Sequence, residues 1–429
     1  MQRNAGFLYG SGYLGIALIT YVIGAWITYF YAPPPHSGLW QFMPPAWAGL
    51  AFAIGRIVDA VADPLVGVWS DRHRGKRGRR IPFLRASAVP LALSFAILWL
   101  PPQGTSPIAA FIYLTLTLGA FFTLYTVYVA PYLALLPQLS RSEADRLNLS
   151  VWQGIFNVVG IAIGALAAGM IASALGFGWM GVIFGAVTLV SLVIPAWMVQ
   201  EPASTEAEIA DMGVASSIRS TLANRPFRAY VAGQFCFWFG LNAVLINAPY
   251  LVTVVAGKGE VEASIALGVA ILASVAAFPV FVRIAKRYGL RQSLIVSMIW
   301  FAVVLFLAGL VGRPFMPFSA YTQVLLVNFL AGVPIAALLV LPNPLMAEIT
   351  DYDERATGKR REAIYFGVQG LIVKASMALS SVLATQMLSR LGYTPDAPWG
   401  VLAIGPMAGL FVLLGITIFR RYPRSVPGN

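Results

Sequence analysis

Twelve long apolar runs, separated by short polar gaps, constrain this chain more than any other feature. Each run is long enough for a transmembrane helix, which needs about 20 mostly apolar residues. With 59% hydrophobic and 11% charged residues, the 429-residue chain has more apolar surface than one aqueous core can bury. This composition argues against a soluble enzyme and excludes a disordered or fibrous protein. The expected spans are residues 8–31, 44–70, 82–101, 107–138, 150–174, 178–199, 226–256, 261–283, 291–312, 318–346, 362–388 and 397–420.

A polar stretch at residues 200–225 divides the twelve runs into two groups of six. We expect an N-terminal six-helix bundle (1–199), a cytoplasmic linker (200–225) and a C-terminal six-helix bundle (226–429). A short repeat supports this division, because Trp-Gln-Gly154 and Val-Gln-Gly370 occupy equivalent places in the two halves. Two six-helix halves related by a parallel repeat resemble major facilitator transporters. The fold class expected is therefore an all-α membrane protein with twelve transmembrane helices in two pseudo-symmetric bundles, the major facilitator fold.

The distribution of basic residues predicts the orientation in the membrane. If both termini lie on one side, that side carries 24 of the 29 Lys and Arg residues, and the other side carries Lys258, Arg313 and Arg390. Positive charge accumulates on the cytoplasmic side, so both termini are predicted to be cytoplasmic. The net charge of +12 is spread over short gaps between apolar runs, which argues against a nucleic-acid partner. The first run is interpreted as a retained helix, and the protein as a multi-pass plasma (inner) membrane protein.

Four charged residues inside the predicted spans are the strongest functional signal. Arg56, Asp59 and Asp63 share one face of the second span, and Lys374 lies in the eleventh. Each charge at the bilayer centre costs at least about 2.5–3.5 kcal/mol, so these residues need partners or a water-filled cavity. Two nearby carboxylates resist being ionised together, so either one holds a proton or a cation lies between them. The pattern predicts a site for a coupling cation, H⁺ or Na⁺; the alternative is a buried ion network.

The loop after the second span carries a second motif, Gly-x-x-x-Asp-Arg followed by Gly-Arg-Arg. Asp71 ends its helix, where the helix dipole disfavours an anion, so it needs a basic partner. A charged contact that forms and breaks between states suits alternating access. The alternative is a plain topology signal. The residues of this predicted conformational latch are Gly67, Asp71, Arg72, Arg79 and Arg80.

Known catalytic and cofactor patterns are missing from the sequence. It contains no Ser–His–Asp, Cys–His, Walker or dinucleotide-binding pattern, and its two histidines have no metal-ligand neighbours. We therefore expect a protein that is not an enzyme, has no cofactor and holds no metal beyond a possible Na⁺.

The intramembrane motifs resemble those of the glycoside–pentoside–hexuronide:cation symporter family, the relatives of melibiose permease. Arg56-Ile-Val-Asp59-Ala-Val-Ala-Asp63-Pro matches the family's second-helix motif, and residues 351–362 with Lys374 match its motif between helices ten and eleven. The resemblance covers essentially the whole chain. It implies a secondary active transporter that couples a cation to a small solute by alternating access. Asp59, Asp63 and Thr126 would bind the cation, with Lys374 nearby.

Departures from the family pattern bear on the ion and the substrate. The resemblance places Ala62 where relatives often have an amide ligand, which favours H⁺ over Na⁺. It also places Ala17 and Val129 where the sugar-binding acids occur. We expect a sugar or glycoside substrate; a lysolipid or amphipathic-solute carrier is the alternative, and a non-transporting assembly factor is the second. Arg56 and Lys374 would lie near the substrate, and the remaining candidates for polar lining are Tyr125, Tyr128, Gln153, Asn157, Asn242, Asn247 and Gln369. The expected partners are the solute, the cation and the lipid bilayer, with the monomer as the functional unit.

Overall fold

The computed structural model forms helices and loops, without β-strands, over the residues that it describes, which are 5–73, 78–140, 142–201, 214–358 and 361–423. Ten helical segments in this part are long and apolar enough to cross a membrane. Two further helices complete the expected set: α4 (Ile81–Ile97), which is apolar but shorter, and α3 (Pro45–Arg72), which carries the intramembrane charges. The predicted all-α, twelve-helix membrane fold is confirmed.

The chain divides into two compact units. The first contains Met1–Ala32 and Trp40–Asp211, and the second contains Pro33–Leu39 and Met212–Asn429. The boundary falls inside the predicted linker 200–225. Residues 202–213 of that linker lie outside the described residues, and its last part forms a helix, α8 (Val214–Ala223).

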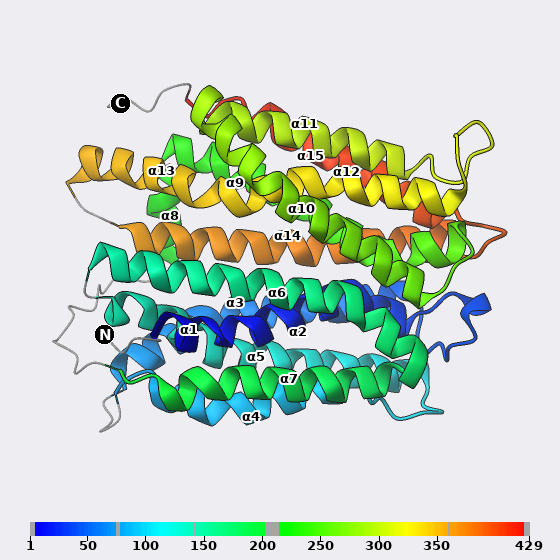
Figure 1. Ribbon diagram of the computed structural model, residues 1–429, viewed down its shortest axis with the longest axis horizontal. Coiled ribbons are helices and arrows are strands. Elements are labelled where there is room, and N and C mark those ends of the chain that lie inside the picture. Colours follow the sequence, from blue (N-terminus) through cyan, green and yellow to red (C-terminus); the bar gives the residue numbers. More distant parts are fainter. Residues whose placement is uncertain (1–4, 74–77, 141, 202–213, 359–360, 424–429) are drawn as a thin grey trace. The chain divides into compact units, whose positions relative to one another are not determined.

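In the first unit, long helices run side by side along one direction (Figure 1). Helix α2 packs against α6 and α7, α3 packs against α5, and α4 packs against α5 and α7. The helices not yet delimited are α1 (Ala5–Gly10), α2 (Gly12–Tyr31), α5 (Pro107–Leu139), α6 (Glu143–Leu175) and α7 (Phe177–Met198).

The second unit repeats this packing pattern. Its first transmembrane helix, α9, packs against α14 and α15, its second, α10, against α12, and its third, α11, against α15. If the six membrane helices of each half are numbered from 1 to 6, the same pairs pack together in both units. These pairs are 1 with 5, 1 with 6, 2 with 4, and 3 with 6. The short sequence repeat thus reflects a repeated helix arrangement. The helices are α9 (Arg225–Tyr250), α10 (Glu260–Tyr288), α11 (Leu290–Ala308), α12 (Ala320–Val340), α13 (Pro342–Thr357), α14 (Glu362–Leu391) and α15 (Trp399–Phe419).

Some predicted runs are interrupted. The run 318–346 breaks at Leu341, because Pro342 and Pro344 have no N–H to continue the ladder of α12, and α13 begins there. The run 8–31 breaks at Ser11, between α1 and α2. In the second unit, α9 widens into a π-helix, η2 (Leu251–Val255), just after Pro249. The carbonyl of Thr253 in this π-helix lies 3.1 Å from Nε2 of His36 in the 33–39 segment.

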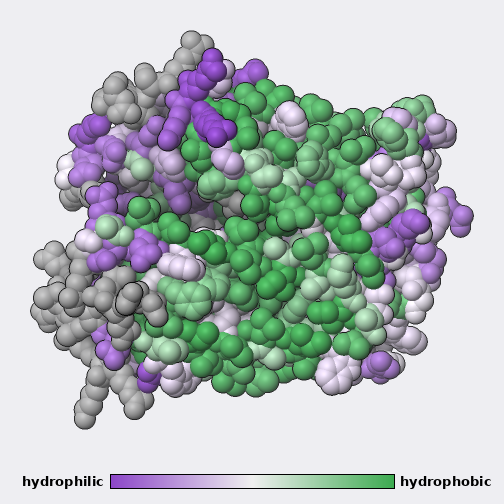
Figure 2. All heavy atoms as spheres, in the orientation of Figure 1, coloured by the Kyte–Doolittle hydropathy of each residue, from purple (hydrophilic) through white to green (hydrophobic). Residues whose placement is uncertain are grey.

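The surface agrees with a bilayer environment. On the face seen in Figure 2, hydrophobic residues cover the middle of the helices and hydrophilic residues gather at their ends. Many large apolar side chains in mid-helix are exposed, among them Leu65, Leu116 and Leu272. Side chains of this kind are stable when they face lipid.

Candidate functional site

Two carboxylates and a hydroxyl meet inside the first unit. Asp59 and Asp63 lie one turn apart on α3, and Thr126 comes from the middle of α5, which packs against α3. The Thr126 Oγ1 atom lies 2.8 Å from Oδ1 of Asp59 and 3.2 Å from Oδ1 of Asp63. Asp59 is completely buried, whereas Asp63 is half-buried. The structure therefore brings together the three residues that the sequence predicts to bind the cation.

Arg56 supplies a permanent positive charge to this cluster. Its Nη1 lies 3.3 Å from Oδ2 of Asp59, and both side chains are largely buried. The guanidinium also lies over two rings, with its central carbon 4.4 Å from the centroid of Phe122 and 5.2 Å from that of Phe52. Contacts of this kind hold a cation through the quadrupole of the ring. Sequence analysis missed both rings, because nothing in the sequence distinguishes them from the other phenylalanines of these apolar helices.

The close packing of α3 against α5 fixes this arrangement. A Cβ at Gly55 would stand 2.9 Å from the Phe122 ring, so the small residue allows the ring to approach the helix that carries Arg56. Pro64 stands inside α3 directly after Asp63, and α3 continues through it. Since proline has no N–H, it leaves a backbone carbonyl one turn earlier without its helical donor.

Lys374 lies on α14, in the second unit, and is half-buried. The same helix carries Gln369, whose Nε2 donates to the Tyr230 hydroxyl at 3.1 Å. The Gln369 Oε1 is buried and accepts no hydrogen bond from the described part of the protein. The proximity of Lys374 to the two aspartates stays a prediction.

Several other predicted lining residues pack the bundles. The Tyr128 hydroxyl donates to the carbonyl of Leu192 at 2.8 Å, tying α5 to α7, and the side chain is fully buried. The amide of Asn242 donates to the carbonyl of Met377 at 3.2 Å, tying α9 to α14. In the first unit, Tyr125, Gln153 and Asn157 are only half-buried.

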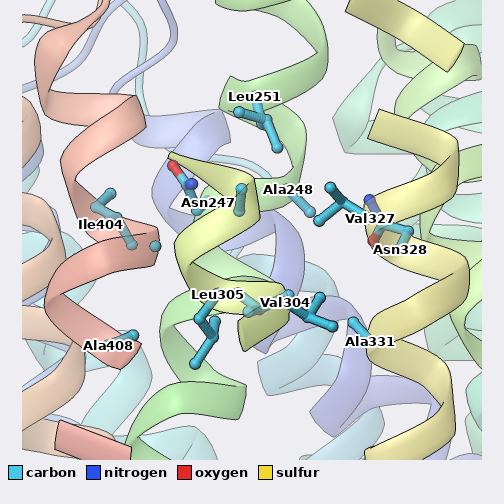
Figure 3. A pocket seen from close by; sticks show the side chains of 13 residues that line it. Asn247, Ala248, Leu251, Val304, Leu305, Val327, Asn328, Ala331, Ile404 and Ala408 are labelled. Atoms are coloured by element: carbon cyan, nitrogen blue, oxygen red, sulfur yellow. The ribbon is translucent and has the colours of Figure 1, made fainter. Parts of the chain in front are cut away.

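Asn247 lies at a small cavity within the second unit, together with Asn328 (Figure 3). The amide nitrogens donate to the carbonyls of Val401 and Val324, and both Oδ1 atoms are buried without a partner among the described residues. The cavity has a volume of about 30 Å³. Sites for small molecules usually occupy ~300–1,000 Å³, so this cavity holds no more than water-sized molecules.

The loop motif after α3 is anchored by an acid that sequence analysis had placed in the linker. Glu201 Oε2 accepts from the backbone N–H groups of Arg80 at 2.8 Å and Ile81 at 3.2 Å, and so satisfies the first turn of α4. Gln138, with its amide oriented to satisfy its neighbours, donates to Glu201 Oε1 and accepts from Arg79 Nη2, both at 3.3 Å. Part of the predicted latch thus belongs to a network that joins α4, α5 and the end of α7.

The remaining latch residues make fewer contacts. Arg72 is exposed, and Gly67 lies inside α3 with nothing within 4 Å of where its Cβ would stand. The side chain of Asp71 lies outside the described residues, so its predicted basic partner stays a prediction.

A different anchor lies in the second unit, in the motif between α13 and α14. Arg361 forms a two-point ion pair with Asp353, with nitrogen–oxygen distances of 2.9 and 2.6 Å. These hydrogen bonds raise the pKa of Arg361, so the guanidinium stays charged. The pair links α13 to the residue that precedes α14.

Comparison with known proteins agrees with this architecture. The family described as MFS/sugar transport protein matches residues 8–423. An uncharacterized symporter of Synechocystis sp. is 24% identical over 97% of this chain and 93% of its own. The isoprimeverose transporter of Lactiplantibacillus pentosus is 23% identical over 87% of this chain and 78% of its own. Among solved structures, a mutant of the nucleoside transporter NupG has a TM-score of 0.69 at 12% identity, covering 96% of this chain and 98% of its own, a likeness that shows the fold.

These matches identify the kind of protein. The described residues contain ten helices that are long and apolar enough to cross a membrane, the matching family is one of transporters, and the relatives are named symporters. The protein is therefore an integral multi-pass membrane protein that is a transporter and not an enzyme. The resemblance to the glycoside–pentoside–hexuronide:cation symporters is confirmed. The chain belongs to the MFS/sugar transport protein family of the major facilitator superfamily, as a symporter that moves a solute together with a cation.

Proposed function

We propose that the protein couples the uptake of a neutral polar solute, a sugar or glycoside, to a proton carried by Asp63. The observation that carries this proposal is the position of Thr126 between the two carboxylates. A hydroxyl has one proton to donate, yet two carboxylate oxygens lie within hydrogen-bond distance of it. If Thr126 donates to Asp59, the contact with Asp63 is favourable only when Asp63 brings a proton or a cation binds there.

The different burial of the two carboxylates supports Asp63 as the proton carrier. Asp59 is fully buried and paired with Arg56, so its charge is already compensated. Asp63 is the more exposed of the two carboxylates, so it is the better placed to exchange a proton with water. Its neighbour Ala62 brings no oxygen, so a bare Na⁺ would find few side-chain ligands. A proton needs only one oxygen, which is why we favour it over Na⁺.

The side chains available for the solute support a neutral substrate. Position 17, where the resemblance would place a sugar-binding acid, is a buried alanine that packs against α6. A Cβ at Gly160 of α6 would stand 3.0 Å from the Ala17 Cβ, so α2 and α6 approach each other closely at position 17. Tyr125, Gln153, Asn157 and Gln369 are neutral groups that can donate and accept hydrogen bonds, as sugar hydroxyls require.

Uptake into proteoliposomes tests this proposal. Purified protein would be given a panel of radiolabelled sugars and glycosides and a lysophosphatidylcholine, under an inward pH gradient without Na⁺ and under an Na⁺ gradient at equal pH. We expect accumulation of a sugar or glycoside under the pH gradient, its collapse by a protonophore, and its loss in Asp63→Asn. Glu143→Gln, an exposed acid on α6, is the matched control and should accumulate normally.

Each alternative predicts a different result. Accumulation under the Na⁺ gradient alone would make Na⁺ the coupling ion. Uptake of the lysolipid but no sugar would favour the amphipathic-solute carrier. Undiminished accumulation by both Asp63→Asn and Asp59→Asn would remove the coupling role and leave the carboxylates as a structural ion network. No uptake of any tested compound, together with binding of a protein partner, would favour the assembly factor.

We also propose that both termini are cytoplasmic, on the basis of the 24 basic residues that share their side. This orientation places the Glu201 network and the Arg361–Asp353 pair at the cytoplasmic ends of their bundles.

A further inference from the structure

A groove of about 400 Å³ runs along the second unit, at the end where α9 begins. Helix α9 forms its floor, α14 and α15 flank it, and α8 contributes Leu222. Its walls are apolar and include Val231, Phe235, Ile372, Phe411 and Leu414, and among the described lining residues only Arg228 is charged. The volume lies within the usual range of ligand sites, ~300–1,000 Å³.

The groove follows the direction of the helices. Its lining on α9 extends from Arg228 to Cys236, a rise of ~12 Å at ~1.5 Å per residue. The antiparallel α15 lines it from Ile418 back to Phe411. The rings of Phe239 and Phe411 stack with centroids 3.9 Å apart, next to the end of the groove that is farthest from Arg228. The groove is therefore charged at one end and apolar along the rest.

The position of Arg228 in the helix places its guanidinium at the membrane interface. The span Arg225–Val255 has 31 residues, or ~46 Å at ~1.5 Å per residue, against a hydrocarbon core of ~30 Å. Arg228 is the fourth residue of this span, so it lies at the level of the lipid headgroups, and the groove extends from there toward the bilayer centre. A phospholipid has the same arrangement, with a headgroup at the interface and acyl chains that extend toward the bilayer centre.

Arg228 has no counter-charge in the described part of the chain. Its side chain is exposed, and no described residue there accepts a hydrogen bond from its guanidinium or pairs with it. Arg225, one turn earlier, and Arg219 on α8 are exposed as well. Basic residues beside grooves between transmembrane helices recognise anionic lipid headgroups.

We propose that this groove binds one anionic glycerophospholipid, with the phosphate at Arg228 and an acyl chain along Phe235, Ile372, Phe411 and Leu414. The inference concerns a lipid that stays with the second unit. It is independent of the coupling ion and of the transported solute.

Native mass spectrometry of detergent-purified protein tests this proposal. The protein would be titrated with a long-chain phosphatidylglycerol and with the phosphatidylcholine of the same acyl chains. We expect one retained phosphatidylglycerol per chain and weaker retention of phosphatidylcholine. Arg228→Gln should weaken binding of phosphatidylglycerol about fivefold, the effect of one basic residue near an anionic surface, and Arg228→Lys should restore most of it.

Three controls separate binding in the groove from general electrostatic attraction. Arg225→Gln removes an equally exposed charge that does not line the groove, and it should leave binding unchanged. Ala232→Phe should fill the groove and weaken binding, and phosphatidylglycerol with six-carbon chains should bind more weakly than the long-chain lipid even to the unaltered protein. The comparison of short-chain with long-chain lipid uses the unaltered protein, so it remains informative whether or not Ala232→Phe folds.

Three results would overturn the proposal. Equal retention of the two lipids would exclude recognition of an anionic headgroup. Equal losses in Arg225→Gln and Arg228→Gln would indicate a diffuse basic surface. Equal binding of short and long chains would exclude an acyl chain in the groove.

Discussion

The guanidinium carbon of Arg56 lies 4.4 Å from the centroid of the Phe122 ring, while Nη1 of the same side chain reaches Oδ2 of Asp59 at 3.3 Å. The buried Arg56 therefore contacts an aromatic face and pairs with a buried carboxylate at the same time. Its other ring contact, to Phe52, lies on its own helix. The orientation of Arg56 beside the Asp59–Asp63–Thr126 cluster thus depends on a ring from the neighbouring helix α5.

Replacing that ring should change how uptake responds to pH. Phe122→Leu removes a cation–π contact worth about 0.5–2 kcal/mol, so Arg56 would compensate the cluster less well and a proton would bind there more readily. We expect the pH of half-maximal uptake to move upward by about half a unit or more. The measurement is initial uptake in proteoliposomes over a series of external pH values.

The neighbouring residue provides a matched control. Phe121 is also fully buried on α5, and its ring contacts are with Phe95, Phe122 and Tyr125. Phe121→Leu should lower stability by a similar amount without moving the pH profile. The same displacement in both variants would attribute it to general loosening of the bundle and contradict a specific role for Phe122.

The two aspartates should differ in their effect on stability. Asp59→Asn leaves the buried Arg56 guanidinium without its counter-charge, and breaking a buried pair in this way costs about 3–5 kcal/mol. Asp63→Asn is nearly isosteric at a half-buried position and should cost little. Both should abolish concentrative uptake, but only Asp59→Asn should lower the temperature of thermal unfolding by several degrees.

A double variant checks the cause of that loss. In Arg56→Gln/Asp59→Asn both charges are removed, so much of the stability lost in Asp59→Asn should return. If the double variant were less stable than Asp59→Asn, the uncompensated guanidinium would not be the reason for the loss.

Two glycines of the loop motif should respond oppositely to alanine. Gly78 has φ +98°, and a Cβ there would overlap the carboxylate of Glu201. Gly78→Ala should therefore destabilise the protein by at least the ~1–2 kcal/mol of a left-handed backbone and weaken the cap on α4. Gly67→Ala, inside α3 with open space around it, should stabilise the helix by ~0.5–1 kcal/mol. Thermal unfolding of both variants measures the difference. Equal unfolding temperatures for the two variants would mean that the contact between Glu201 and α4 does not require glycine at position 78.

The predicted topology can be tested with reporters. A fluorescent protein fused after Asn429 should fold and fluoresce, since that end is expected in the cytoplasm. Alkaline phosphatase inserted at Gly104, in the exposed turn between α4 and α5, should be active outside. The reverse pattern would overturn the orientation that the basic residues predict.

The parts that sequence predicted well depend on local periodicity. Apolar runs mark helices directly, and a spacing of four residues puts Asp59 and Asp63 on one face whatever surrounds them. The residues that sequence analysis missed act through contacts between distant segments. Glu201 reads as one acid among several in a polar stretch, and only the packing of α7 beside α4 shows that it caps a helix. Phe122 is one of 26 phenylalanines, and its role depends on the register between α3 and α5.

The Arg56–Asp59 pair also has an electrical consequence. Arg56 offsets the charge of Asp59, and the proposed cycle adds one monovalent cation at Asp63. A cycle that carries one such cation with a neutral solute would be electrogenic, with a stoichiometry of one to one. The membrane potential would then drive it directly: about 100 mV contributes ~2.3 kcal/mol per charge, equivalent to a roughly fiftyfold solute gradient.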